Sequence, residues 1–264
     1  MTKRRPSIIN VIPTYNEKES ILIVLQGLDR IAGKYPQYSW TTLIIDDNSP
    51  DHTGQLVTNF KPHRMKVKLL SGKKEGLGVA MRRGLDYTVR RLSPDIIITN
   101  EADLAYDFNL IPVAVSKINQ GWDVVISSRH GSEGKIEGWT FNRKLNHFIA
   151  NQIFAGWVAG VNQIEDHNGA FRAVRVKGIL DQIDWNKAPI RGFAFFNYWT
   201  YLLTTLTPKI YQLPIIYRFR TRGESKVSFN PKYFGTYVRD VLEYILLCFK
   251  IRGLLLWTTL TGIL

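Results

Sequence analysis

Short apolar runs alternate with amphipathic stretches through the first half of the chain. Runs of strand length occupy residues 7–12, 41–45, 67–70, 96–99 and 124–127. Helical spacing of apolar residues occurs between them, at residues 17–32, 53–60, 77–92 and 110–119. This order with short connections predicts an α/β fold, in which a mostly parallel sheet is covered by helices on both faces. Asn16 is the predicted N-cap of the first helix.

Polar clusters follow four of the predicted strands. They are PTYNE (13–17), DDNSPD (46–51), EAD (101–103) and SSRH (127–130). Each cluster taken alone also suits an ordinary polar turn. In an open α/β sheet, however, ligands bind outside the carboxyl ends of the strands, so we expect the four clusters to form one site.

The chain is strongly basic, with a formal net charge of +13 and a sequence pI of about 9.8. Such an excess favours a polyanionic partner, which leaves nucleic acid, anionic lipid and phosphorylated substrates as candidates. No basic-aromatic motif typical of nucleic-acid binding is present, so we expect no nucleic-acid partner. The single cysteine, Cys248, excludes an internal disulfide, and we expect a reducing, cytoplasm-facing location.

Glu101 and Asp103 directly follow an apolar run, and two acids in a basic protein need a reason. A solvated loop is the simplest one. A glycoside hydrolase also uses two carboxylates, but these must flank a sugar, which neighbouring loop positions do not normally achieve. The third alternative is a divalent cation held between the carboxylates and substrate phosphates. This alternative explains why a basic protein carries two acids at the end of a strand, because the acids hold the ion and basic residues hold the phosphates.

The sequence GLG at residues 76–78 is a weak signal for a phosphate-binding loop. It matches neither a Walker P-loop nor a G-x-G-x-x-G fingerprint. A plain loop-to-helix turn explains it equally well, and a dinucleotide-dependent dehydrogenase is disfavoured.

Nine motifs, taken in order, resemble the dolichyl- or polyprenyl-phosphate mannose synthases, which are family 2 glycosyltransferases of the GT-A fold. They are PTYNE (13–17), DDNSPD (46–51), GLG (76–78), EADL (101–104), SSRH (127–130), W-x-x-x-R-K (139–144), A-N (150–151), D-x-N-G-A-F-R (166–172) and R-x-x-G-E-S-K (220–226). The resemblance covers roughly residues 7–230. The first two motifs indicate the broad superfamily, whereas the last is the narrower signature of a polyprenyl-phosphate acceptor.

The resemblance implies inverting transfer of a hexose, most often mannose from GDP-mannose, to a polyprenyl or dolichyl phosphate with Mg²⁺ or Mn²⁺. One alternative is a glucosyltransferase that uses UDP-glucose, or another family 2 transferase. An alternative of a different class is a catalytically silent, membrane-bound subunit that binds nucleotide sugars.

Matching motifs carry the family's site residues onto this chain. The resemblance implies a nucleoside pocket of Pro13, Tyr15, Glu17, Ile45 and Asp47, and a metal motif of Glu101, Ala102 and Asp103. It also implies phosphate contacts from Arg129, Arg220 and Lys226, to which we add Arg143 as a hypothesis. Arginines suit this role because they make charge-assisted, often bidentate bonds to phosphoryl oxygens. Glu101 and Asp103 are the predicted metal ligands.

Several positions depart from the family pattern. Glu101 stands where Asp is usual, and Ala105 where Gln or Ser can help to coordinate metal. The other departures are His147 for Ser, Asn168 for Thr, and Phe196 and Tyr198 for Gln and Glu. These changes motivate the silent-subunit alternative.

The C-terminal part of the chain is rich in apolar residues. Residues 233–252 have one continuous apolar helical face. Residues 253–264 carry no charge, but a helix of that length reaches about 18 Å, short of the roughly 30 Å hydrocarbon core. We therefore expect a GT-A domain at residues 1–230 and a membrane-associating segment at 231–264, although packing of this helix on the sheet is an alternative. The expected location is the cytoplasmic face of a membrane, with an anionic membrane surface and a membrane-anchoring subunit as candidate partners.

Overall fold

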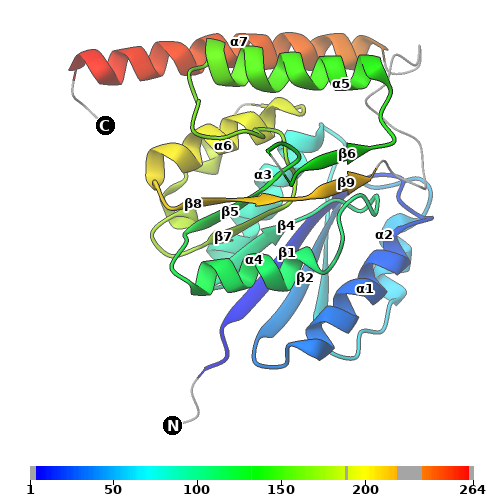
Figure 1. Cartoon of the computed structure of the whole chain (residues 1–264). Helices are drawn as coiled ribbons and strands as arrows, with labels where there is room; N and C mark the ends of the chain where they lie inside the picture. The colour runs from blue at the N-terminus through cyan, green and yellow to red at the C-terminus, as the bar shows by residue number, and fades with distance from the viewer. Residues whose placement is uncertain (1–3, 132, 188–189, 219–233, 262–264) are drawn as a thin grey trace.

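A central sheet of seven strands organises the computed structural model, which describes residues 4–131, 133–187, 190–218 and 234–261 (Figure 1). The strand order is β3-β2-β1-β4-β7-β5-β8. The strands are β1 (Ser7–Thr14), β2 (Ser39–Asp46), β3 (Lys66–Ser71), β4 (Ile96–Thr99), β5 (Val124–Ser128), β7 (Arg172–Arg175) and β8 (Ile210–Pro214). All neighbours pair in parallel except β7, which is antiparallel to both β4 and β5. The mostly parallel sheet is confirmed.

Helices cover both faces of this sheet. They are α1 (Ile21–Lys34), α2 (Thr53–Asn59), α3 (Leu77–Tyr87) with the π-helical η1 (Thr88–Leu92), α4 (Leu110–Asn119), the short 3₁₀ turns η3 (Leu180–Gln182) and η4 (Trp185–Lys187), and α6 (Ala194–Leu206). Figure 1 shows α1 and α4 in front of the sheet and α3 behind it. Helix α3 can pack closely against β2 because residue 84 is a glycine. A Cβ at Gly84 would come within 2.0 Å of the Cδ1 atom of Ile45 on β2.

The carboxyl ends of β1, β2 and β4 are tied together by backbone hydrogen bonds. The Asp47 N–H donates to the Thr14 carbonyl (3.2 Å), and the Asn100 N–H donates to the Val11 carbonyl (3.3 Å). The three strands are almost fully buried, as continuous apolar runs in a parallel sheet should be. The polar residues that follow them therefore emerge at one edge.

The predicted start of the first helix is wrong. Asn16 has a left-handed backbone (φ 55°), and α1 begins only at Ile21, with Ser20 as N-cap. Residues 17–20 form a turn instead, in which the Ser20 and Ile21 N–H groups both donate to the Glu17 carbonyl. Glu17 thus lies in the loop between strand and helix, close to the end of β1.

A separate helical layer lies beyond this edge of the sheet (Figure 1). It consists of α5 (Phe141–Phe148), which continues into the π-helical η2 (Ile149–Val158), and α7 (Phe234–Thr261). The small parallel pair β6 (Lys135–Glu137) and β9 (Ile216–Arg218) lies between this layer and the sheet. The apolar helical face expected over residues 233–252 belongs to a longer helix, because α7 runs on through Gly253. None of the helices in the described ranges combines the length and the apolar character that a membrane span requires.

Candidate active site

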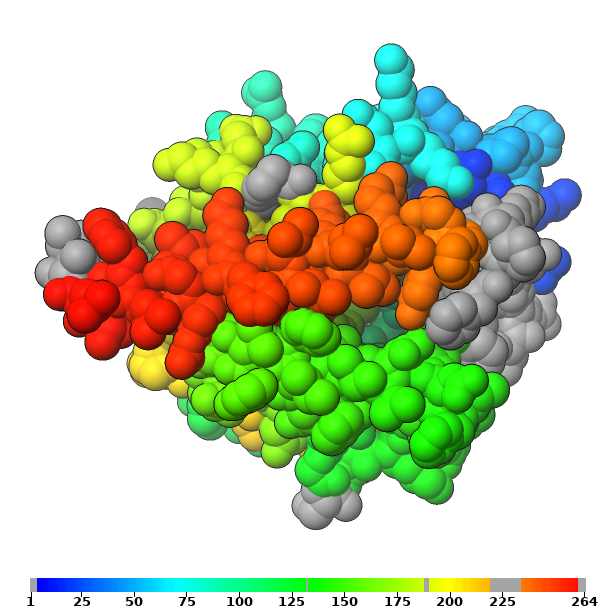
Figure 2. Space-filling view, turned by 90° about the horizontal axis from the view of Figure 1, so that it is seen from above, coloured from blue at the N-terminus to red at the C-terminus, as the bar shows by residue number. Residues whose placement is uncertain are grey.

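A cavity of about 500 Å³ lies where the carboxyl edge of the sheet meets the layer of α5, η2 and α7. Glu101 and Asp103 reach it from the loop after β4, Arg129 from the end of β5, and Arg143 and His147 from α5. Figure 2 shows α7 lying along the α5–η2 segment, and both helices contribute to the wall. The structure therefore brings four of the predicted site residues, Glu101, Asp103, Arg129 and Arg143, into one cavity.

The two acids are placed by a tight turn after β4. Leu104 has a left-handed backbone (φ 64°), which is costly for this residue type and turns the chain directly after Asp103. One carboxylate oxygen of Asp103 accepts the Ala105 N–H at 3.1 Å, and Asp103 is buried. Two carboxylates on the wall of one cavity suit Mg²⁺ or Mn²⁺, which are held by a few carboxylates and by substrate phosphates. Ala105, by contrast, is buried and offers only a methyl group.

Arg129 is fixed by a buried ion pair with Asp166. Its Nε and Nη2 atoms donate to the two Asp166 oxygens at 2.6 and 2.7 Å, and its backbone N–H donates to the same carboxylate. Burial alone would raise the pKa of Asp166, but the adjacent guanidinium holds it well below its usual range. The pair is ionised and bidentate, so Arg129 is held in a single orientation. The sequence analysis assigned no role to Asp166, although this residue begins the motif D-x-N-G-A-F-R (166–172).

Two guanidinium groups lie over the ring of Trp139. Its ring centroid is 5.5 Å from Cζ of Arg129 and 4.8 Å from Cζ of Arg143, distances typical of cation–π contacts. Tyr217 of β9 adds a second ring at 5.3 Å from Arg129. The buried indole Nε1 of Trp139 donates no hydrogen bond to any described residue. The aromatic rings thus keep two cations close together on one wall of the cavity.

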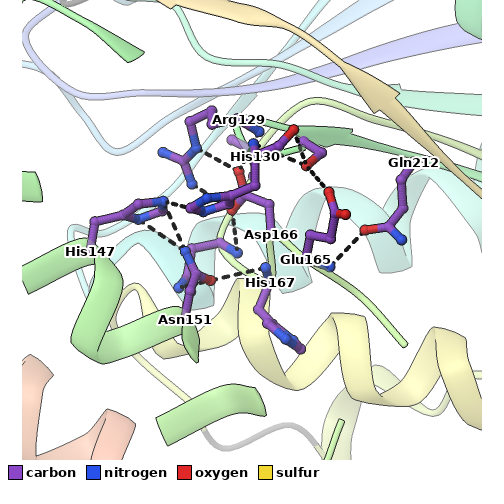
Figure 3. A network of polar contacts seen from close by, with 12 residues as sticks. Arg129, His130, His147, Asn151, Glu165, Asp166, His167 and Gln212 are labelled. Atoms are coloured by element: carbon purple, nitrogen blue, oxygen red, sulfur yellow. Dashed lines mark hydrogen bonds and ion pairs between the residues drawn. The ribbon is translucent and has the colours of Figure 1, made fainter. Parts of the chain in front are cut away.

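A chain of polar contacts behind this wall holds the ring of His147 (Figure 3). The His167 N–H donates to the Asn151 side-chain oxygen at 3.0 Å, which turns the Asn151 amide nitrogen toward the His147 ring, 3.0 Å from Nδ1 and 2.9 Å from Nε2. Nε2 of His147 lies 3.0 Å from Nε2 of His130. Burial, and then the charge of Arg129, lower the pKa of His147 to about 3. His147 is therefore neutral, although it lies beside two arginines.

His130, His147 and Asp166 form a second group that offers metal ligands, with three ligand atoms within 4.8 Å of one another. Both oxygens of Asp166 already accept hydrogens from Arg129, and the two imidazoles contact each other through their Nε2 atoms at 3.0 Å. The pair Glu101 and Asp103 is the better fit for a divalent cation, because its oxygens belong to the chemistry that Mg²⁺ and Mn²⁺ prefer.

The neutral state of His147 predicts an acid-dependent loss of stability. Its pKa is about 3 in the folded protein but about 6.5 when unfolded, so only the unfolded chain binds this proton between those values. The stability that the folded protein has while His147 is neutral is therefore fully present above about pH 6.5, and it is lost as the pH falls toward 3. Between pH 7 and pH 5, urea denaturation should show the wild type losing about 2 kcal/mol more than His147→Asn. A His52→Asn control at an exposed position should follow the wild type, and an equal loss in all three proteins would contradict the assignment.

The predicted nucleoside residues lie around the ends of β1 and β2. Pro13 and Ile45 are direct partners in the β1–β2 register. Tyr15 has the Lys74 ammonium group 3.6 Å above its ring, and Asp47 pairs with Arg83 at 2.7 Å. None of these residues lines the cavity that contains Glu101, Asp103, Arg129 and Arg143. They lie instead beyond β1 on the same edge, next to the cavity rather than in it.

The remaining predicted residues have different outcomes. Ala102 is buried between the two acids and contributes no polar side-chain atom. Arg220 and Lys226, with their whole motif at residues 220–226, lie outside the described residues. Arg83 and Asp166 are polar residues at this edge that the sequence analysis did not assign.

Comparison with known proteins identifies the family. Residues 10–180 match the family described as glycosyl transferase family 2. The chain belongs to this family. This family 2 glycosyltransferase is 30% identical over 246 residues to the dolichol-phosphate mannosyltransferase of Pyrococcus furiosus, covering 92% of this chain and 64% of that protein. It is 28% identical over 235 residues to the polyprenol monophosphomannose synthase of Mycolicibacterium smegmatis, covering 88% and 83%. The resemblance drawn from the motifs is confirmed.

Solved structures similar to this glycosyltransferase confirm the predicted GT-A fold. Mannosyl-3-phosphoglycerate synthase from Rubrobacter xylanophilus superposes with a TM-score of 0.67 at 15% identity, covering 94% of this chain and 75% of that one. The mannosyltransferase PcManGT from Pyrobaculum calidifontis, solved with GDP-Man and Mn²⁺, gives a TM-score of 0.54 at 14% identity, covering 99% and 77%. Similarity at this level of identity establishes the fold alone.

Proposed function

We propose that this family 2 glycosyltransferase transfers a hexose, most favourably mannose from GDP-mannose, to a polyprenyl or dolichyl phosphate with inversion. The observation that carries the proposal is the single cavity that joins the carboxylates of Glu101 and Asp103 to the guanidiniums of Arg129 and Arg143. The names of the relatives from Pyrococcus furiosus and Mycolicibacterium smegmatis support the substrate class.

Glu101 and Asp103 are the residues that would hold Mg²⁺ or Mn²⁺. Bound there, the ion supplies charge neutralisation for the diphosphate leaving group. Arg129 acts on phosphate oxygens without any reorganisation, because Asp166 already fixes its orientation. Arg143 adds a second cation, which also lies over the ring of Trp139.

The reaction needs no strong general base, because the nucleophile is an oxygen of a phosphate anion. That oxygen forms a bond to the anomeric carbon of the sugar as the bond to the nucleoside diphosphate breaks on the opposite side, which inverts the centre. The arginines offset the repulsion between the two anions. His147 is neutral, so it adds no third charge to the arginine pair. Contacts of Arg220 and Lys226 with donor or acceptor phosphates stay a prediction.

Two alternatives keep specific support. The chemistry of the cavity suits a glucosyltransferase that uses UDP-glucose equally well, because its two carboxylates and two arginines suit a cation and phosphates and do not distinguish one hexose from another. A silent nucleotide-sugar-binding subunit is favoured by Ala105, whose buried methyl group replaces a side chain that can help to coordinate metal.

We further propose that the layer of α5, η2 and α7 meets an anionic membrane surface on its cytoplasmic side. Phe141, Trp157 and Leu260 expose 77%, 76% and 86% of their surface on this layer. Other apolar side chains exposed on it are Leu145, Phe148, Ile153, Leu246, Phe249, Leu256 and Trp257. An apolar helical layer beside the mouth of a phosphate-binding cavity is where a lipid headgroup would enter. The division into residues 1–230 and 231–264, and a membrane-anchoring subunit, belong to this proposal.

Removing one tryptophan from this layer should weaken vesicle binding. Trp157→Ser and Trp257→Ser are each expected to lower the partition coefficient onto anionic vesicles about tenfold, because each removes apolar area from the lipid interface. Val113→Ser on α4, which lies away from this layer in Figure 1, is the control and should bind as the wild type does. Equal vesicle binding by all four proteins in a flotation assay would exclude the layer as the contact.

Product mass tests the function itself. The purified protein is incubated with polyprenyl phosphate, Mg²⁺ or Mn²⁺, and one of several GDP- and UDP-sugars, with the unphosphorylated polyprenol as control acceptor. We expect a hexosylated lipid phosphate from one donor and none from the polyprenol. No product from any donor would favour the silent subunit.

A further inference from the structure

We propose that Glu243 of α7 is a positioning residue, which holds the start of α3 at the carboxyl edge of the sheet and so sets the affinity for the nucleotide sugar. The inference rests on the proposed function and adds to it a residue that does not itself line the cavity. It also gives a role to the GLG sequence at residues 76–78, which the proposed reaction leaves without one. The connection between the two runs through one short segment, residues 190–192.

The side chain of Glu243 holds segment 190–192 from the side of α7. One carboxylate oxygen accepts the Arg191 N–H at 2.9 Å, and the other accepts the Gly192 N–H at 2.8 Å. These two donors directly precede α6, which begins at Ala194, so the carboxylate also lies near the positive end of that helix dipole. Hydrogen bonds to an ionised acceptor are the stronger kind, and two of them together fix the orientation of the segment.

Asp240, one turn earlier on α7, lies against the same segment. A Cβ at Gly192 would come within 2.6 Å of the Asp240 carboxyl carbon, so only glycine allows this approach. Asp240 and Glu243 are the only acidic residues of α7, and both face segment 190–192. Asp240 and Phe193 also line the cavity. The segment is therefore held directly beside the cavity wall.

The other side of segment 190–192 packs on the first turn of α3. The Gly78 N–H donates to the Arg191 carbonyl at 2.8 Å. A Cβ at Gly78 would come within 2.4 Å of the Ile190 carbonyl oxygen. A Cβ at Gly76 would come within 2.5 Å of the Arg191 carbonyl oxygen, and Gly76 has a φ of 118°, a conformation that favours glycine. Both glycines are thus needed for the backbone of the segment to approach α3.

The start of α3 carries partners of two residues that we predict to line the nucleoside pocket. The Lys74 ammonium group, just before the helix, lies 3.6 Å from the ring centroid of Tyr15. Arg83 on the helix pairs with Asp47 at 2.7 Å. A shift of α3 would move both partners at once. If only a fraction of the molecules has α3 in place, the apparent affinity for the donor falls by that fraction.

An alternative role for Glu243 is purely structural, since it also fastens α7 to the beginning of α6. The two roles differ in the kinetic constant that they change. Loss of a structural contact lowers the folded fraction, which lowers kcat and leaves both KM values unchanged. Loss of a positioning contact raises the KM for the donor and leaves the KM for the acceptor unchanged.

The test is the initial rate of hexosyl transfer by the full chain, with GDP-mannose and in parallel with UDP-glucose as donor. Donor and polyprenyl phosphate are each varied while the other is saturating. Glu243→Gln keeps the size of the side chain but offers one acceptor oxygen to two N–H groups. We expect it to raise the donor KM about tenfold and to leave the acceptor KM within about twofold. The control Asp107→Asn changes an exposed acid that also accepts a backbone N–H, and it should match the wild type.

A second variant reaches the same segment from the opposite side. Gly78→Ala adds a methyl group that displaces residues 190–192 from α3, so its donor KM should rise to a similar extent. Gly253→Ala on α7, where a Cβ meets nothing within 4 Å, is the matched control. In the variant that combines Gly78→Ala with Glu243→Gln, the donor KM should stay within about twofold of the higher single value, because both changes break one connection.

Each outcome decides the proposal. An unchanged donor KM in Glu243→Gln, with or without a lower kcat, would overturn the positioning role while leaving the proposed transferase intact. Effects of Glu243→Gln and Gly78→Ala that multiply in the combined variant would overturn it as well, since the two residues would then act separately. A wild type that forms no product from either donor would overturn both this inference and the proposed function.

Discussion

Replacing Asp103 by Asn is expected to lower the rate of hexosyl transfer about a thousandfold at saturating donor and acceptor. The substitution keeps the size of the side chain and the oxygen that accepts the Ala105 N–H, so the turn after β4 stays in place. It removes one of the two negative charges that line the same cavity as Arg129 and Arg143. The melting temperature should therefore stay within a degree or two of the wild-type value.

The matched control is Asp107→Asn in the same loop. Asp107 is exposed, caps the Asn109 N–H and does not line the cavity, so its loss should leave the rate within about twofold. The measurement is the initial rate of product formation at several Mn²⁺ concentrations. A rate for Asp103→Asn within tenfold of wild type would remove Asp103 from the catalytic group.

Replacing Asp166 by Ala is expected to lower the free energy of unfolding by about 3–5 kcal/mol, because it leaves the Arg129 guanidinium buried without its partner. Transfer should be lost as well, since Arg129 loses the two hydrogen bonds that orient it. Arg4→Ala, which breaks an exposed pair with Asp95, should cost less than about 1 kcal/mol.

A double variant separates stability from function. Arg129→Met combined with Asp166→Leu removes both charges and should recover most of the lost stability, because an apolar pair of similar volume often replaces a buried ion pair without cost. It should not recover transfer. Denaturant unfolding and the product assay measure the two effects, and a double variant that transfers hexose at the wild-type rate would show that Arg129 has no part in the reaction.

The sequence predicted the sheet and the edge at which the site forms, because buried parallel strands are continuous apolar runs that end in polar clusters. Glu101, Asp103, Arg129 and Arg143 could be assigned in this way, through their positions after strands and in motifs. The antiparallel β7 was not foreseen, because its four residues carry no periodicity that reports strand direction. That the two apolar stretches on either side of residue 252 form one helix was not predicted, and Gly253 weakens a helix without ending it.

Two site residues depend on contacts that no local pattern reveals. Asp166 meets Arg129 across 37 positions of the sequence, and Arg83 meets Asp47 across 36. Both are pairs of opposite charge brought together by the sheet, and each partner alone reads as an ordinary polar residue. Such pairs become visible only when the strands are placed side by side.

Anomalous diffraction from crystals grown with Mn²⁺ and GDP, and in parallel with UDP, tests the central claim most directly. We expect one manganese peak between the carboxylates of Glu101 and Asp103, in contact with the diphosphate and in the same cavity as Arg129. A peak at His130 and His147 instead, or a diphosphate bound away from both acids, would contradict the account.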